Sequence, residues 1–153
     1  MKILFISSNS PFESIGGIER YIINLINYYK NQKKTEFVLI LPSLEKSHFV
    51  REGNMTTYYT NSLSMSYSQK EITRKSRLFS ELVEEVIKKH KITIICAENI
   101  IFGPPPVFSM LLNMLAGLYK IPLVLRLHMY PVSDLQIELT MLTRKKRLLK
   151  KKL

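Results

Sequence analysis

The sequence predicts an α/β fold, with a Rossmann-like parallel sheet and helices on both of its faces. Short apolar runs of strand length recur along the chain, and they alternate with longer segments whose apolar residues repeat at helical spacing. The runs are continuous, as in strands that are buried on both faces. With 153 residues, 46% of them hydrophobic and 23% charged, the chain is long enough for one domain with its own core.

The first elements follow in order from the N-terminus. Lys2–Ser7 predicts a buried strand, and the polar residues 8–15 predict a loop. A helix is expected from about Ile18 to Asn31, because its apolar residues recur at i, i+3, i+4, i+7, i+8 and i+11. Phe37–Leu41 predicts the second strand.

The middle of the chain alternates in the same way. The polar residues 43–53 predict a loop, and Met55–Thr60, rich in Thr and Tyr, predicts a third strand. Gln69–His90 predicts a long helix with an apolar stripe, and Ile92–Ala97 predicts another buried strand.

The last elements begin after three consecutive prolines. Val107–Tyr119 predicts a helix, since proline suits the first helical turn. It is shorter than the roughly 20 apolar residues of a membrane span, so we interpret it as a buried helix. Pro122–Leu127 predicts the final strand, which ends at His128. A loop is expected over residues 129–134.

Residues 1–134 are therefore expected to form one domain, and residues 135–153 a basic amphipathic helix. The last ten positions hold seven of the 23 Lys and Arg residues in a chain whose net charge is +11. Such a helix either lies on an anionic membrane surface or packs on further structure with its basic side in water. Nucleic acid is not expected as a partner, because no aromatic residues interleave with the basic ones.

The composition excludes several classes of protein. The single cysteine, Cys96, rules out an internal disulfide and offers no zinc-site spacing, and we expect a small core residue rather than a nucleophile. The residues after Met1 lack the apolar length and the cleavage site of a signal peptide. We therefore expect a cytoplasmic protein, attached peripherally to the inner face of the membrane if the tail binds lipid. No metal is expected.

A glycine pair marks the first candidate ligand site, because open α/β sheets bind ligands outside the carboxyl ends of their strands. Gly16 and Gly17 let the backbone approach a ligand, and the free amides of the following helix favour an anion such as phosphate. The alternative is a tight loop whose glycines only supply positive φ. The spacing matches neither the dinucleotide fingerprint nor a phosphate loop with its lysine, which argues against a dehydrogenase or an NTPase.

Two motifs carry a resemblance to a known family. The first strand, a loop holding Pro11 and the run Gly16-Gly17-Ile18-Glu19-Arg20 resemble the start of the family 4 glycosyltransferases of the GT-B fold. Residues 118–128, in which a helix leads through Ile121-Pro122 into a strand ending in His128, are similar to a later segment of that family. The motifs occur in the family's order, and the resemblance covers nearly all of the chain.

The resemblance implies the N-terminal half of a GT-B architecture, namely the acceptor-binding domain of a retaining, metal-independent glycosyltransferase of the hexosyltransferase type. Such an enzyme transfers a sugar from a nucleotide-diphosphate sugar to a glycan or lipid-linked acceptor, as in polysaccharide biosynthesis, and the sugar nucleotide is a substrate rather than a cofactor. Gly16 and Gly17 then face the donor diphosphate or the acceptor. His128, near the transferred sugar, is the candidate catalytic residue; its alternative role is a hydrogen bond to nearby backbone.

Four further charged or polar residues each have two candidate roles. Arg20 reaches a phosphate or lies in solvent. Glu98 and Asn99, which stand where family members often carry a histidine, bind acceptor hydroxyls or cap the next turn. Arg126, inside an apolar strand, needs a partner if buried, and it either pairs with Glu98 or reaches an anionic acceptor. For Glu19, attraction to the helix dipole is sufficient explanation.

The sequence ends at Leu153, before the final strand of such a domain and before a nucleotide-binding C-terminal domain. We therefore expect a truncated enzyme or one half of a split one, inactive alone, with the missing domain or a companion chain as its partner. The alternative is a non-catalytic α/β module that binds a partner glycosyltransferase chain or a membrane surface. A small-molecule enzyme of another doubly wound family would need a phosphate loop or a catalytic pair, and neither is evident.

Overall fold

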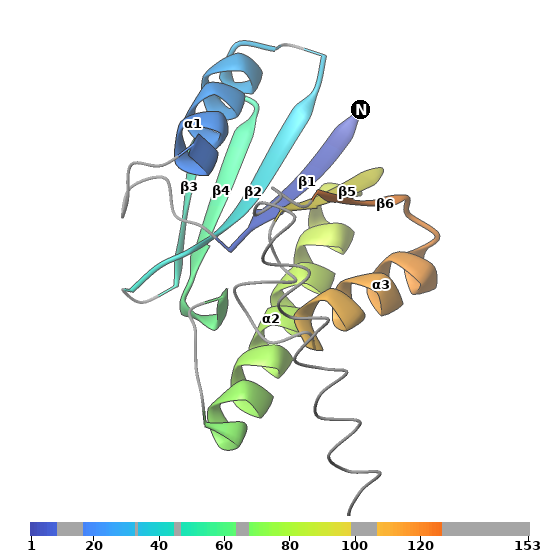
Figure 1. Ribbon diagram of the computed structural model, residues 1–153. Helices are drawn as coiled ribbons and strands as arrows, with labels where there is room; N and C mark the ends of the chain where they lie inside the picture. The colour runs from blue at the N-terminus through green and yellow to red at the C-terminus, as the bar shows by residue number, and fades with distance from the viewer. Residues whose placement is uncertain (9–16, 33, 45–46, 64–67, 99–106, 127–153) are drawn as a thin grey trace, which may run out of the picture.

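The computed structural model describes residues 1–8, 17–32, 34–44, 47–63, 68–98 and 107–126, which contain one six-stranded sheet in the order β3-β4-β2-β1-β5-β6 (Figure 1). The strands are β1 (Lys2–Ser7), β2 (Glu36–Pro42), β3 (His48–Glu52), β4 (Met55–Thr60), β5 (Ile94–Glu98) and β6 (Leu123–Arg126). The helices are α1 (Gly17–Lys30), α2 (Gln69–His90) and α3 (Val107–Tyr119), with a 3₁₀ turn, η1, at Asn61–Leu63. Every neighbouring pair of strands is parallel except β3 and β4, so the predicted α/β fold is confirmed.

Helices cover both faces of the sheet, because successive strand residues point to opposite sides. Phe5 and Leu39 are among the residues that pack under α1, around the fully buried Ile22. Leu4 and Val38 belong to the other face, which α2 and α3 cover (Figure 1). The continuous apolar runs of β1 and β2 are thus explained by burial on both sides.

The second face is held together by an aromatic contact between its two helices. The rings of Phe79 in α2 and Phe108 in α3 lie 4.9 Å apart in an edge-to-face arrangement, and both side chains are completely buried. Such a pair adds to the burial of apolar area on which the domain depends.

The C-terminal end of α2 is tied to the sheet by a chain of polar contacts. His90 Nδ1 lies 2.6 Å from a carboxylate oxygen of Glu36, and its Nε2 lies 2.9 Å from the hydroxyl of Tyr58. Lys2 Nζ reaches the other oxygen of Glu36 at 3.2 Å. The helix then ends at Lys91, whose φ of 53° is left-handed and whose N–H donates to Ile87 O. His90 therefore has a structural role here.

One predicted loop is partly wrong, because its second half forms β3. Within residues 43–53, His48–Glu52 pairs antiparallel with β4, and Gly53 and Asn54 make the two-residue turn between them. Gly53 has a φ of 61°, which glycine adopts without strain. All five residues of β3 are exposed, so the strand shows no burial pattern, but a Gly-Asn pair between two extended runs is a hairpin signal.

The other predicted helices and strands within the described residues are confirmed to within two residues at either end. Several predictions fall on residues outside the described ranges, namely the loop from Asn9, Gly16, Asn99, His128, the loop over 129–134 and the helix over 135–153. The division of the chain at residue 134 remains a prediction. Within the part of the chain that is described, none of the helices has the length and apolarity that crossing a membrane requires.

Candidate functional site

The candidate site lies where the order of the strands reverses. From β1 the chain passes through α1 to β2 on one side, whereas α2 later leads to β5 on the other side of β1. Ligands of open α/β sheets bind at the carboxyl ends of two neighbouring strands whose connections lead to opposite sides of the sheet. Ser7 of β1 and Glu98 of β5 are partners in the register at this point, and both are completely buried.

Glu98 makes an ion pair with the neighbouring strand. Nη1 of Arg126 donates to its carboxylate oxygen Oε1 at 3.3 Å, and the two residues are also register partners on β5 and β6. The carboxylate is fully buried, while half of the Arg126 side chain is exposed. Of the two roles predicted for Arg126, pairing with Glu98 is therefore observed.

Tyr21 completes the cluster from α1, the helix that covers one face of the sheet. Its hydroxyl accepts a hydrogen bond from Nη1 of Arg126, and the guanidinium carbon lies 5.0 Å from the centre of its ring, a cation–π arrangement. Burial, followed by the negative charge of Glu98, raises the pKa of Tyr21 in spite of Arg126. The phenol therefore stays protonated at neutral pH. The Tyr21–Arg126–Glu98 cluster joins three elements at one edge of the sheet.

Cys96 lies two residues before Glu98 on the same face of β5. Burial raises the pKa of its thiol; the charge of Arg126 opposes this, and that of Glu98 adds to it. A thiol held in its neutral form is a poor nucleophile, which agrees with the predicted core role. Among the described residues no three His, Cys, Asp or Glu side chains are grouped so as to hold a metal ion.

The N-terminus of α1 lies on the same helix as Tyr21. Gly17 is its first residue and is exposed, and a Cβ there would have no described atom within 4 Å. Arg20 is exposed, whereas Glu19 is only 6% exposed, which the helix dipole alone does not explain.

The predicted site residues are thus only partly brought together. Glu98 and Arg126 are in contact, and Gly17 and Arg20 begin the helix that carries their partner Tyr21. Gly16, Asn99 and His128 lie outside the described residues. Tyr21 was missed as a site residue because its helical spacing assigns it to the buried face of α1. It is 105 residues from Arg126, and no local pattern signals that contact.

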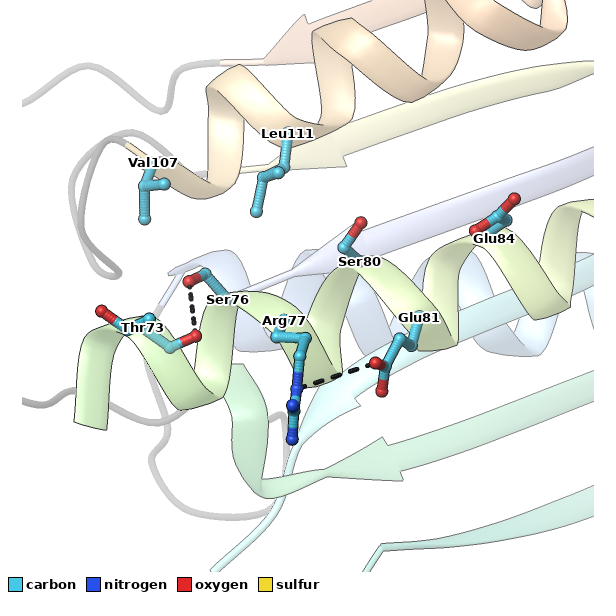
Figure 2. A pocket seen from close by; sticks show the side chains of 8 residues that line it. All are labelled: Thr73, Ser76, Arg77, Ser80, Glu81, Glu84, Val107 and Leu111. Atoms are coloured by element: carbon cyan, nitrogen blue, oxygen red, sulfur yellow. Dashed lines mark hydrogen bonds and ion pairs between the residues drawn. The ribbon is translucent and has the colours of Figure 1, made fainter. Parts of the chain in front are cut away.

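A groove of about 330 Å³ on the opposite face runs between α2 and α3 (Figure 2). Several of its polar residues already have partners: Ser76 donates to Ile72 O at 2.7 Å, Arg77 pairs with Glu81, and Glu84 accepts from Tyr119 at 2.6 Å. The other wall is apolar, formed by Val107 and Leu111. We interpret this groove as the junction of two packed helices, because these polar groups already bond within α2 or between α2 and α3.

Comparison with known proteins connects this fold to a sugar-transferring enzyme. The chain matches no protein family and no curated protein in sequence. Its structure is similar to that of a sucrose-phosphate synthase from Thermosynechococcus elongatus, with a TM-score of 0.64 over 88% of this chain and 12% sequence identity. The chain spans about a third, 35%, of the length of that enzyme.

The likeness defines the class of fold. The mostly parallel six-stranded sheet is a Rossmann-like half-domain, and its structural neighbour is a GT-B glycosyltransferase. The chain thus has a fold similar to that of one part of this enzyme.

Proposed function

We propose that this chain is the acceptor-binding domain of a retaining glycosyltransferase, which takes a sugar from a nucleotide-diphosphate sugar to a glycan or lipid-linked acceptor. The observation that carries the proposal is the Tyr21–Arg126–Glu98 cluster at the reversal of strand order, on a glycosyltransferase-like fold. Parallel sheets bind ligands at this edge. In this proposal the protein acts in the cytoplasm, and it acts at the inner face of the membrane when the acceptor is lipid-linked.

Within this proposal the three residues have different roles. Arg126 contacts the acceptor, because half of its side chain is exposed and guanidinium groups donate in fixed directions to hydroxyl or anionic oxygens. Glu98 is a positioning residue, since its buried carboxylate holds Arg126 but has no exposed surface of its own. Tyr21 fixes the guanidinium plane from α1. Gly16, Gly17 and Arg20 contact the donor diphosphate or the acceptor, Asn99 binds the acceptor, and His128 acts in catalysis.

The nucleotide is assigned to further structure, either a C-terminal domain or a companion chain. The correspondence with only 35% of the neighbouring enzyme supports this division. The β6 end of the fold also exposes apolar side chains, with Val124 and Leu125 each over 40% exposed. Met114 and Leu118 of α3 are 66% and 70% exposed. Packing against a second domain would remove such surface from water.

Binding and turnover of the purified 153-residue chain test the proposal. We expect it to bind members of an array of oligosaccharides and lipid-linked saccharides, and to consume no sugar from a panel of UDP- and GDP-sugars. Replacing Arg126 by Gln should weaken saccharide binding about tenfold or more, because a group that hydrogen-bonds the ligand is lost. Arg77→Gln, on the opposite face, is the matched control and should bind normally.

Two results would count against the proposal. Consumption of a sugar nucleotide by the isolated chain would show that the donor site lies within it. Equal saccharide affinities of Arg126→Gln, Arg77→Gln and the unmodified chain would separate the cluster from acceptor binding, even if some saccharide binds.

A second candidate is a non-catalytic α/β module that pairs with a companion glycosyltransferase chain or lies on a membrane surface. The exposed apolar residues of α3 and β6 support this candidate as well as they support packing against a further domain of the same enzyme. A downstream reading frame that encodes the remaining half of the enzyme would favour the split-enzyme proposal. A companion chain with both halves intact would favour the module.

A further inference from the structure

β3 carries exposed apolar residues, and no strand among the described residues pairs with its outer edge. β3 is the first strand in the sheet order, and within the described residues it pairs only with β4. Phe49 and Val50 are 59% and 43% exposed (Figure 1 shows the strand at the margin of the sheet). Such an edge is a template for another strand, although proteins commonly protect it with charges. In β3 the charged side chains are complementary to those of a second copy of the same strand.

The hydrogen-bonding groups at this edge follow from the hairpin. Glu52 and Met55 flank its two-residue turn, so they form a hydrogen-bonded pair between β3 and β4. Because such pairs alternate along antiparallel strands, Val50 and His48 are also bonded to β4. The N–H and C=O groups of Phe49 and Arg51 therefore point outward, away from β4.

We propose that two copies of this chain pair antiparallel through β3, about a twofold axis at Val50. In this register, Phe49 of each copy lies opposite Arg51 of the other, so the outward backbone groups of both strands meet and form hydrogen-bonded pairs. Val50 then faces Val50 as a non-hydrogen-bonded pair, in which side chains are closest.

The side chains in this register are complementary on both faces of the sheet. On the α1 face, where Lys30 binds Glu52 with Nζ 2.6 Å from Oε2, Glu52 of one copy lies opposite His48 of the other. On the α2 face, where Lys89 Nζ lies 5.2 Å from the Phe49 ring, Phe49 meets Arg51 of the second copy. Cross-strand pairs of these kinds stabilise a sheet, by aromatic–cation contact and by hydrogen bonding to a carboxylate.

Two neighbouring registers are less suitable. If one strand slides by one residue, so that Val50 lies opposite Arg51, backbone groups that point outward lie opposite groups that point toward β4, and they cannot form hydrogen bonds. A shift by two toward Glu52 sets Arg51 against Arg51, and like charges directly opposite each other destabilise a sheet. The proposed pairing also leaves the Tyr21–Arg126–Glu98 cluster accessible, because β3 and β6 are at opposite ends of the sheet order. It therefore stands independently of the proposed function.

The concentration dependence of the sedimentation coefficient of the full chain tests the pairing, and we expect a reversible monomer–dimer equilibrium. Phe49→Pro removes an outward N–H without removing a bond to β4, so it should weaken dimerisation about tenfold or more. Phe49→Ala loses the side chain but keeps that N–H, and should weaken it less. A chain that is monomeric at every concentration, or a dimer that Phe49→Pro leaves unchanged, would overturn the proposal.

Cross-linking tests the register without relying on the proline variant. In a Cys96→Ser background, Val50→Cys should oxidise to a covalent dimer, because the two Cβ atoms of a directly opposed pair lie within disulfide range. In the proposed register the two Arg51 residues are diagonal rather than directly opposed. Arg51→Cys should therefore cross-link several times more slowly. Equal rates for the two variants would show that β3 edges do not meet in this register.

Discussion

Glu98 is completely buried at the carboxyl end of β5, and its carboxylate lies 3.3 Å from Nη1 of Arg126, 28 residues further along the chain. Arg126 in turn reaches Tyr21 of α1 through the same nitrogen. A buried carboxylate needs such a partner, since an unpaired charge is costly to remove from water. The contact therefore links the stability of this edge of the sheet to the placement of the exposed part of the arginine.

Arg126→Met should lower the free energy of unfolding by about 2 kcal/mol, because it removes the ion pair of the arginine with the buried Glu98 carboxylate. The lower part of the range for buried pairs applies, since half of the arginine is exposed. Denaturant unfolding of Arg126→Met, Glu98→Gln and the double variant measures this. We expect the double variant to lose less than the sum of the single losses; simple additivity would mean that the two residues do not interact.

The contact between Glu36 and His90 predicts a specific acid dependence. Burial by itself would raise the pKa of Glu36, but hydrogen bonds from His90 and Lys2 outweigh it and lower the pKa below its usual 4.5. A carboxylate whose pKa is lower in the folded chain stabilises that state fully above pH 4.5, and this contribution is lost as the pH falls through the lowered value.

Unfolding free energies of the unmodified chain and Glu36→Gln should therefore differ most at neutral pH and converge in acid. Glu81→Gln, an exposed i,i+4 pairing residue of α2, is the control and should show a small difference at all pH values. A gap for Glu36→Gln that widens as the pH falls would contradict the assigned role of the contact.

Phe79→Ala should destabilise the chain by about 3–5 kcal/mol, because it leaves a cavity beside Phe108 at the junction of α2 and α3. Leu118→Ala on the exposed side of α3 should change stability by less than about 0.5 kcal/mol. Thermal or denaturant unfolding compares the two. Similar losses would mean that the outer side of α3 is packed in solution.

Cys96 should react slowly with iodoacetamide at neutral pH, because burial raises the pKa of its thiol above the usual 9.0 and the thiolate is the reacting form. A time course by mass spectrometry, with the chain unfolded in urea as the control, measures the difference. We expect the folded chain to react several times more slowly. Faster reaction in the folded chain would identify an activated cysteine instead.

Most helices and strands were predictable because their signals are local. β1 and β2 have continuous apolar runs, and α2 has apolar residues at helical spacing. Both patterns result from burial on a regular backbone, so they can be recognised in the sequence. β3 was not predicted, because all of its residues face water and only the Gly53-Asn54 turn marks it. Exposed strands carry little periodic signal.

The candidate site was predictable in part. The strand-end rule placed Glu98 among the site residues. Arg126 was singled out as a charged residue inside an apolar strand, and its pairing with Glu98 was one of two alternatives. Tyr21 could not be foreseen, because a tyrosine on the apolar face of a helix has the same spacing whether its hydroxyl is idle or bound to Arg126. Buried Glu19 was likewise indistinguishable in sequence from an exposed residue that favours the helix dipole.

By itself, the sequence determined the α/β class, the order of the helices and of every strand except β3, and which residues stand at the carboxyl ends of those strands. It did so because burial imposes periods of about 3.6 and 2 residues on the chain. Only the tertiary structure decided that Arg126 binds Glu98 and Tyr21, that His90 ties α2 to Glu36, and that β3 forms the outer edge. These contacts join residues 28 to 105 positions apart, and their formation depends on how the strands are ordered in space, which no local period encodes.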